Sequence, residues 1–251
     1  GHRIGVAQAF AHGRHLATLG ASPWARAKLA WAAVWLPTRR RLGRPSGRPI
    51  HLALAKDGRR LDVEVRDLAE LATVGEVLAD DLYAMPELDD VRVIVDLGSH
   101  IGTSILFFRI RHPSAEIHGF EPDPRTFARL HANVGALSDV TIDPRAASGS
   151  AGRARFHSAG NSLASSLIAD AGPGRDVTVA CVTLDEIFDE LGVDRIDLLK
   201  LEYPGSPASC RRLADALHRP WAVLSAGVPF EQFSDVIKIA FEEGGASGFI
   251  A

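Results

Sequence analysis

The sequence predicts an α/β protein with a doubly wound, mostly parallel sheet, preceded by an N-terminal helical extension and a β-hairpin. Residues 91–95 form a short apolar run rich in β-branched side chains, which is typical of a strand buried on both faces. The segment DLGSHIG follows at 96–102 and leads into a helical pattern, ILFFRI. Strand, glycine loop and helix in this order form the entrance to nucleotide-type sites in doubly wound sheets.

Composition places the chain among ordinary globular proteins. Of its 251 residues, 46% are hydrophobic and 24% are charged, and this length allows one large domain or a domain with an extension. The two cysteines, Cys181 and Cys210, lack metal or redox spacing, so we expect buried thiols in a reducing compartment. No apolar run is long enough to span a bilayer and no signal peptide is recognisable, so we expect a cytoplasmic protein.

The charge distribution marks a separate N-terminal part. Residues 1–60 hold 12 of the 28 lysines and arginines but only one of the 31 acidic residues. We therefore expect a basic helical extension with a linker over residues 1–49 and a main domain over residues 50–251. Nucleic acid is not an expected partner, because the main body is acidic and has no aromatic–basic binding motif.

The extension itself is expected to contain two helices. An alanine-rich segment covers 4–19, and Ser22 with Pro23 gives a start signal for a second helix over 24–36. This second helix carries three of the four tryptophans and is followed by three arginines at 39–41. Docking on the main domain with a solvated basic end is the use we favour. Contact with a membrane surface or anionic partner, or a lid over the substrate pocket, stays open.

The main domain shows alternating patterns and turn signals. Residues 50–55 and 60–65 alternate apolar and polar side chains around Lys56-Asp57-Gly58, which predicts a β-hairpin. A helix is expected over 68–81. The expected elements after the first central strand are strand 116–120, helix 124–134, strands 140–142, 154–157 and 177–182, helix 184–191, strand 196–201, helix 207–217, strand 221–224, helix 230–243 and strand 247–250.

The glycine loop discriminates between possible ligands. Dinucleotide sites use G-x-G-x-x-G, whose second glycine lets a pyrophosphate lie on the backbone. Here His100 occupies that position, and the pattern is D-x-G-x-x-x-G. The bulky imidazole argues against a pyrophosphate. The spacing instead resembles the first motif of class I methyltransferases, which bind S-adenosylmethionine (SAM), a ligand without phosphate.

An acidic residue after the second strand supports a site for adenosine. Glu121 follows strand 116–120 directly and lies 25 residues after Asp96. A carboxylate at this place can accept hydrogen bonds from both ribose hydroxyls. Dinucleotide enzymes use the same device, so Glu121 indicates adenosine and not SAM in particular. Asp123 is expected to cap the helix that follows.

The order of the motifs resembles the FkbM family of SAM-dependent methyltransferases across residues 50–251. The matching segments are VGEVLADDLY, VIVDLGSHIGTS, FEPDP, RAAS, NSLASS, VTLDEI and DLLKLEYPG. The resemblance implies a class I methyltransferase fold and O-methylation of sugars, macrolides or other natural products. Two positions depart from the family pattern, because Glu202 stands where it usually has Asp and Pro204 where it usually has Glu.

The resemblance also implies a set of cofactor-binding residues, most of them in the glycine loop and after the second strand. They are Tyr83, Asp96, Gly98, Ser99, Gly102, Thr103, Glu121, Pro122, Asp123, Arg145, Ala146 and Glu202. Methyl transfer to a hydroxyl needs alignment of donor and acceptor, and a base that takes the proton. Glu202 is our first candidate for this base, with His100 and His157 next. Lys200 is a candidate electrostatic partner of the base, and the favoured alternative is that it supports structure or charge balance. No metal is expected, because no second carboxylate is predicted beside Glu202.

Two other functions stay open at this point. A degenerate family member would bind SAM as a scaffold or catalyse another reaction, and Pro204 is the feature that supports this alternative. An NAD-type oxidoreductase is disfavoured by His100 in the loop. The expected partner is a small-molecule acceptor, whose identity the sequence does not predict, and the oligomeric state is equally open.

Overall fold

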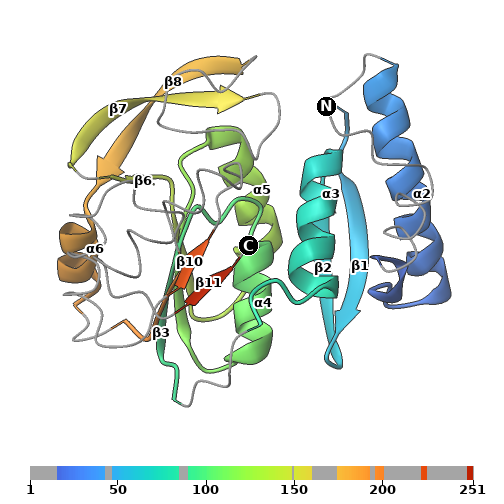
Figure 1. Cartoon of the computed structure of the whole chain (residues 1–251), viewed down its shortest axis with the longest axis horizontal. Coiled ribbons are helices and arrows are strands. Elements are labelled where there is room, and N and C mark those ends of the chain that lie inside the picture. The colour runs from blue at the N-terminus through green and yellow to red at the C-terminus, as the bar shows by residue number, and fades with distance from the viewer. Residues whose placement is uncertain are drawn as a thin grey trace.

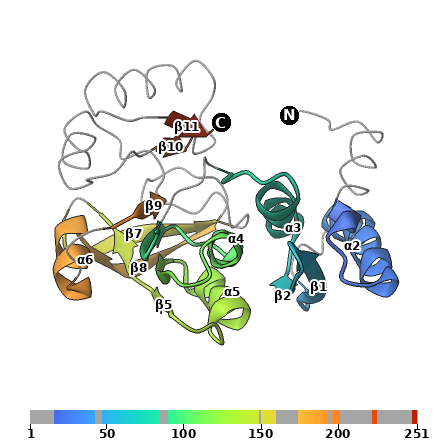
Figure 2. The ribbon, with the colours of Figure 1, turned by 90° about the horizontal axis from the view of Figure 1, so that it is seen from below.

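The fold is given by a computed structural model that describes residues 16–42, 47–84, 90–148, 150–159, 174–192, 196–200, 222–224 and 248–250. A parallel sheet lies at the centre of these residues, with helices on both of its faces (Figures 1 and 2). The predicted α/β class with a mostly parallel sheet is therefore confirmed. The expected helices over 207–217 and 230–243 lie outside the described residues.

The central sheet has four parallel strands in the order β5-β4-β3-β9. Their bounds are β3 Val93–Leu97, β4 Glu116–Phe120, β5 Val140–Asp143 and β9 Leu198–Lys200. The register pairs Asp96 with Lys200 and Leu97 with Phe120, so the strands end at a common edge. Because β4 and β5 lie on one side of β3 and β9 on the other, the strand order reverses between β3 and β9. Doubly wound sheets bind ligands outside this point of reversal.

The first central strand begins two residues later than predicted and includes Asp96. Asp197 explains the beginning, because its Oδ2 accepts hydrogen bonds from the backbone N–H groups of Arg92 and Val93 at 2.8 and 3.1 Å. The end of the strand is set by pairing with β4, which continues to Leu97. A long-range contact of this kind is invisible in a local sequence pattern.

Helices cover both faces of the sheet, because successive side chains of β3 point to opposite sides. Ile94 belongs to the core that also contains residues of α4 (Thr103–Arg111) and α5 (Pro124–Val134). Val95 belongs to a second core under α6 (Leu184–Leu191). Figure 2 shows α4 and α5 on one side of the sheet and α6 on the other.

A second sheet has the order β6-β8-β7. Its strands are β6 Ala146–Ala147, β7 Gly152–Ala159 and β8 Gly174–Val182, and β7 runs antiparallel to β8 over its whole length. Both long strands exceed the predicted ranges 154–157 and 177–182. Pairing between the strands extends them into small and polar residues of low intrinsic strand preference. Two further strands, β10 (Ala222–Leu224) and β11 (Gly248–Ile250), pair in parallel.

The predicted hairpin is present as β1 (Ile50–Lys56) and β2 (Arg59–Val65). Asp57 and Gly58 in its turn have φ angles of 50° and 75°, which is the two-residue turn that matches the twist of a hairpin. The helix predicted over 68–81 consists of α3 (Leu68–Val74) and a π-helical turn, η1 (Gly75–Ala79).

The helix α2 (Pro23–Arg41) lies against this hairpin and α3 at the edge of the molecule (Figure 1). Ser22 caps it as predicted, because its hydroxyl accepts a hydrogen bond from the N–H of Ala25. The helix extends beyond the predicted range 24–36, through Pro37, and its last turn is anchored by a bond from Arg39 to the Arg66 carbonyl. The favoured expectation that this helix docks on the rest of the chain is confirmed.

Two polar connections attach the hairpin and α3 to the central sheet. Asn133 of α5 accepts a bond from the N–H of Glu64 at 2.7 Å, and its amide donates to the carbonyls of Glu64 and Ile101 at 3.2 and 2.8 Å. Arg129 forms a buried ion pair with Glu70 of α3 at 2.5 Å. Since Ile101 lies in the glycine loop, Asn133 connects β2 to that loop directly.

Replacement of Asn133 by Ala is expected to lower the free energy of unfolding by about 2 kcal/mol, because it leaves buried backbone groups of β2 and the glycine loop without their bonds. Chemical denaturation measures this change, and hydrogen exchange should show faster opening of residues 59–65. His131→Ala, an exposed change on the same helix, is the control and should leave both readouts unaltered. Equal unfolding free energies of Asn133→Ala and His131→Ala would contradict a stabilising role of Asn133 between β2 and the glycine loop.

Candidate functional site

The glycine loop between β3 and α4 is fixed by hydrogen bonds to the next strand. The N–H groups of Gly98 and Ser99 both donate to the carbonyl of Phe120, each at 2.9 Å. The Ser99 hydroxyl is buried and donates to the carbonyl of Asp96 at 2.8 Å. The loop is thereby held at the end of β4, next to Glu121.

Two glycines of the loop are needed for different reasons. Gly98 has a φ of +76°, and among the described residues a Cβ built on it would meet only the Lys200 ammonium at 4.0 Å, so these residues leave the space before it open. Gly102 has a φ of +90°, but a Cβ there would lie 2.7 Å from Val134 of α5. Gly98 therefore leaves room for a ligand close to the backbone, whereas Gly102 allows the loop to pack on α5.

Asp96 and Lys200 meet where the strand order reverses. The Asp96 carboxylate is fully buried, and its Oδ1 lies 3.0 Å from the Lys200 ammonium. Its Oδ2 accepts a bond from the Ser104 hydroxyl at 2.6 Å. Lys200 also donates to the carbonyls of Leu97 and Gly98 at 3.3 and 2.6 Å. One cation thus neutralises the buried acid and holds the first turn of the glycine loop.

Glu121 forms the second carboxylate of this edge. It is buried, with Oε2 accepting from the N–H of His100 at 3.0 Å and Oε1 accepting from the N–H of Asp123 at 2.9 Å. Asp123 caps α5 as predicted, accepting from the N–H of Arg125, and its other oxygen accepts from the Ser158 hydroxyl at 2.7 Å. The carboxylate predicted to hold a ribose therefore lies beside the loop, in a fixed orientation.

Burial governs the titration of the two ionisable side chains at this place. It raises the pKa of Glu121 to about 7, although the two backbone N–H groups act in the opposite direction. Burial, followed by the charges of Arg129 and Lys200, lowers the pKa of His100 to about 3. The imidazole is neutral at pH 7 and too weakly basic to be an efficient proton acceptor, which does not favour His100 as the general base.

The other predicted loop residues lie close to this edge. Thr103 is buried at the first position of α4, and Pro122 is half-buried between Glu121 and Asp123. Four other predicted site residues have surroundings that differ from those of the glycine loop: Tyr83, Arg145, Ala146 and His157.

Tyr83 and Ala146 both lie in apolar cores. The Tyr83 ring packs against Phe107 and Phe108 of α4, with centroid distances of 6.1 and 5.7 Å. Ala146 belongs to β6 of the second sheet and is buried together with Phe156 and its neighbours in that sheet. Their positions are explained by packing, and neither is brought to the open space before Gly98.

His157 points away from the edge of the central sheet. It follows Phe156 and precedes Ser158 on β7, and neighbouring residues of a strand point to opposite faces. Ser158 reaches Asp123, whereas the His157 ring lies 2.9 Å from a carboxylate oxygen of Asp176 on β8. The structure therefore does not favour His157 as the base.

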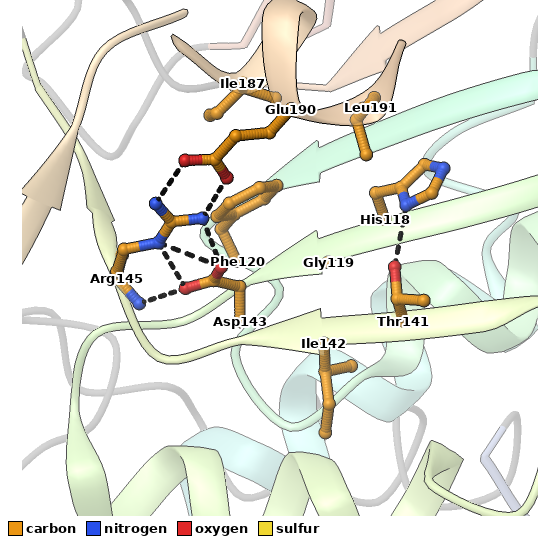
Figure 3. A pocket seen from close by; sticks show the side chains of 10 residues that line it. All are labelled: His118, Gly119, Phe120, Thr141, Ile142, Asp143, Arg145, Ile187, Glu190 and Leu191. Atoms are coloured by element: carbon orange, nitrogen blue, oxygen red, sulfur yellow. Dashed lines mark hydrogen bonds and ion pairs between the residues drawn. The ribbon is translucent and has the colours of Figure 1, made fainter. Parts of the chain in front are cut away.

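Arg145 lines a pocket on the α6 side of the sheet (Figure 3). Its guanidinium donates to both oxygens of Glu190 on α6 and to Asp143 at the end of β5. The bonds to Glu190 and Asp143 raise the pKa of Arg145 well above its usual range. The pocket has a volume of about 110 Å³ and also contains His118, whose ring is bonded to Thr141. Because Arg145 is engaged by two carboxylates, its contact with a cofactor is not supported.

Glu202, the first candidate for the base, lies outside the described residues and remains a prediction. It follows the described end of β9 by two positions in the chain. Among the residues with described placement, no three His, Cys, Asp or Glu side chains gather as a metal site would need. Across the same residues, no helix has the length and apolar character to cross a membrane.

Two serines at the site were missed by sequence reasoning. Ser104 bonds the buried Asp96 carboxylate, and its only signal is a polar position within the apolar start of a helix. Ser158 bonds Asp123 across 35 positions of the chain. The pairing of β7 decides where Ser158 points, so no local pattern could have identified it.

The known proteins to which the chain is similar are methyltransferases. Residues 96–206 match the methyltransferase FkbM domain. The chain is 40% identical over 60 residues to the 31-O-demethyl-FK506 methyltransferase FkbM of Streptomyces tacrolimicus, covering 23% of either chain. It is 29% identical over 133 residues to the 2-O-methyltransferase NoeI of Sinorhizobium fredii, covering 45% of this chain and 54% of that protein.

The chain spans about a quarter and about half of the length of these two relatives. A crystal structure of the methyltransferase FkbM from Methylobacillus flagellatus is similar at 14% identity with a TM-score of 0.36, covering 84% of this chain and 46% of that one. The similarity to the FkbM family therefore rests on the matched domain and the two sequence relatives.

Replacement of Lys200 by Met is expected to lower the free energy of unfolding by about 3 kcal/mol, because it leaves the buried Asp96 carboxylate without its cation. The double variant Lys200→Met/Asp96→Asn should recover a large part of this loss. Urea denaturation of Lys200→Met, Asp96→Asn, the double variant and the original chain gives the four unfolding free energies of a double-mutant cycle. Additive effects of the two substitutions would show that Asp96 and Lys200 do not interact.

Proposed function

We propose that the chain is a methyltransferase of the FkbM family, and that it uses SAM to methylate a hydroxyl group of a small molecule. The names of two relatives describe O-methyl transfer, one to 31-O-demethyl-FK506 and one to a 2-oxygen, and this supports the choice of oxygen. A natural product or a sugar is the class of acceptor that we propose.

The observation that carries this proposal is the open space before Gly98 beside the Glu121 carboxylate. A side chain at position 98 would enter this space, so a ligand can approach the backbone there. Glu121 lies next to it, and its oxygens are oriented by two N–H groups of the chain. A carboxylate beside a glycine loop suits the two hydroxyls of an adenosine ribose.

The residues at the edge would have distinct tasks in methyl transfer. When bound, SAM supplies a methyl group that its sulfonium has already activated. Glu121 would accept bonds from the ribose, and Lys200 would keep the Gly98 carbonyl and the loop in place. We propose Glu202 as the base that takes the proton from the acceptor hydroxyl as its oxygen attacks the methyl carbon. The cytoplasmic location and the absence of a metal from this reaction are part of the same proposal.

An NAD-type oxidoreductase is the second candidate function. A carboxylate at the position of Glu121 would serve NAD equally well. The loop disfavours it, because His100 occupies the position where a glycine normally lets pyrophosphate reach the backbone. His100 has a φ of 52°, so the loop takes the turn without a glycine and places an imidazole there.

Gly98→Val is expected to abolish binding of S-adenosylhomocysteine, the product that SAM leaves, because the new side chain fills the open space. Gly58→Val is the matched control. Its φ of +75° imposes the same backbone strain, with nothing within 4 Å of the added Cβ and far from the site. Calorimetry should show micromolar binding to the original chain and the control, and much weaker binding of NAD. Preference for NAD would contradict the proposal.

Transfer is then measured with radiolabelled SAM and a panel of sugars and hydroxylated macrolides. Appearance of label as a methoxy group in the acceptor supports O-methylation. SAM binding without transfer to any acceptor would favour the degenerate scaffold.

Affinity for S-adenosylhomocysteine is expected to fall about tenfold as the pH is lowered from 8 to 6. The folded pKa of Glu121 is raised to about 7, so the carboxylate is ionised above this pH and protonated below it. Two ribose donors favour the ionised form, and their contribution is lost as the pH falls through 7. In Glu121→Gln, affinity should be weaker and independent of pH over this range. An equal pH dependence in that variant would assign the titration to another group.

A further inference from the structure

The outer side of α2 carries a line of large apolar side chains that the part of the chain described by the structure leaves uncovered. Trp24, Trp31 and Trp35 are 82%, 50% and 39% exposed, and Leu42 directly after the helix is 67% exposed. Their spacings of 7, 11 and 18 residues correspond to two, three and five helical turns, so they form one line. We refer to these four residues as the tryptophan stripe.

The stripe is distinct from the face by which α2 docks. The docking face consists of Ala25, Leu29, Ala32 and Leu36, all of them buried. It packs towards the hairpin and α3, which lie on the inner side of the helix (Figure 1). The helix therefore has two apolar faces, of which the fold uses one. Trp31 and Trp35 stack on each other with ring centroids 5.9 Å apart, which keeps both rings ordered on the outer face.

The helix that carries the stripe is basic. The helix contains five basic residues and no acidic one, and the first acidic residue of the whole chain is Asp57. Arg26, Lys28 and Arg41 are exposed. Arg39 belongs to the fold, since it is buried and donates to the Arg66 carbonyl. The partner of this face must therefore accept aromatic rings and attract cations.

We propose that the tryptophan stripe docks α2 lengthwise on an anionic lipid surface. Indole rings favour the headgroup level of a bilayer, where the apolar ring is shielded and the N–H stays hydrated. Lysine and arginine side chains of the same helix are attracted to anionic lipid headgroups. At 1.5 Å per residue, the 19-residue helix offers a contact line of roughly 28 Å. The helix lies on the membrane, because its other face is occupied by the protein core.

A second copy of the chain is a less suitable occupant. A twofold contact through the stripe would place the exposed cations of one copy next to those of the other, with no acidic residue of α2 to compensate. An anionic bilayer has the opposite charge and needs no complementary pocket. Charge complementarity therefore favours lipid.

The test measures co-sedimentation of the full chain with vesicles. One set contains equal parts of phosphatidylcholine and phosphatidylglycerol, and the other only phosphatidylcholine. The original chain is expected to bind the anionic set at least tenfold more strongly. Trp31→Ala/Trp35→Ala should weaken this binding about tenfold or more. Arg26→Gln/Lys28→Gln/Arg41→Gln should weaken it by roughly fivefold for each charge removed.

The matched control removes three exposed charges from β7 and β8, on the opposite side of the molecule from α2: Arg153→Gln/Arg155→Gln/Arg175→Gln (Figure 1). It should bind like the original chain, and thermal unfolding should show that every variant retains the fold. Equal binding to both vesicle sets, or an equal loss in the control, would overturn the proposal. The proposal would also be overturned if sedimentation velocity showed a dimer of the original chain and a monomer of Trp31→Ala/Trp35→Ala, because the stripe would then bind a second copy.

Discussion

The buried carboxylate of Asp96 is the constraint on which the rest of the central structure depends. Water cannot solvate it, so the fold must supply partners, and an acid left alone at this depth would cost several kcal/mol. Ser104 supplies one bond from α4 and Lys200 supplies a cation from β9. These partners come from both sides of the point where the strand order reverses. Lys200 also donates to the Gly98 carbonyl. The same side chain therefore neutralises Asp96 and fixes the shape of the glycine loop.

Glu121 shows how the same edge can hold a second carboxylate with different properties. Its hydrogen-bond partners are two backbone N–H groups. Burial outweighs these bonds and the attraction of the Lys200 charge, and raises the pKa of Glu121 to about 7. The two carboxylates thus have different roles. Asp96 is neutralised by Lys200 and stabilises the fold, whereas Glu121 can accept further hydrogen bonds from donors. A neighbouring glycine keeps space open for a ligand that brings such donors. This difference, more than the number of glycines, supports an adenosine site.

The N-terminal part contributes to the same body through long-range contacts. Asn133 links β2 to the glycine loop, and the Glu70–Arg129 pair links α3 to α5. Leu29 and Leu36 of α2 share the core that contains Ile105 of α4. The proposed boundary between residues 1–49 and 50–251 remains a prediction, but the described part of the extension packs as an outer layer and leaves its aromatic face to solvent.

Apart from the short strand β6, the sequence alone determined the order of the described strands and helices, the hairpin with its Asp57–Gly58 turn, the glycine loop and the acid after the second strand. These features are local, since periodicity, caps and turn residues act over a few positions. The tertiary structure decided which residues meet. It brought Lys200 to Asp96, 104 positions away, placed Ser158 on Asp123, and engaged Arg145 with Glu190 and Asp143, away from the predicted cofactor site. It also decided that the tryptophans of α2 face outwards, because both faces of that helix are apolar and only packing selects the one that is buried.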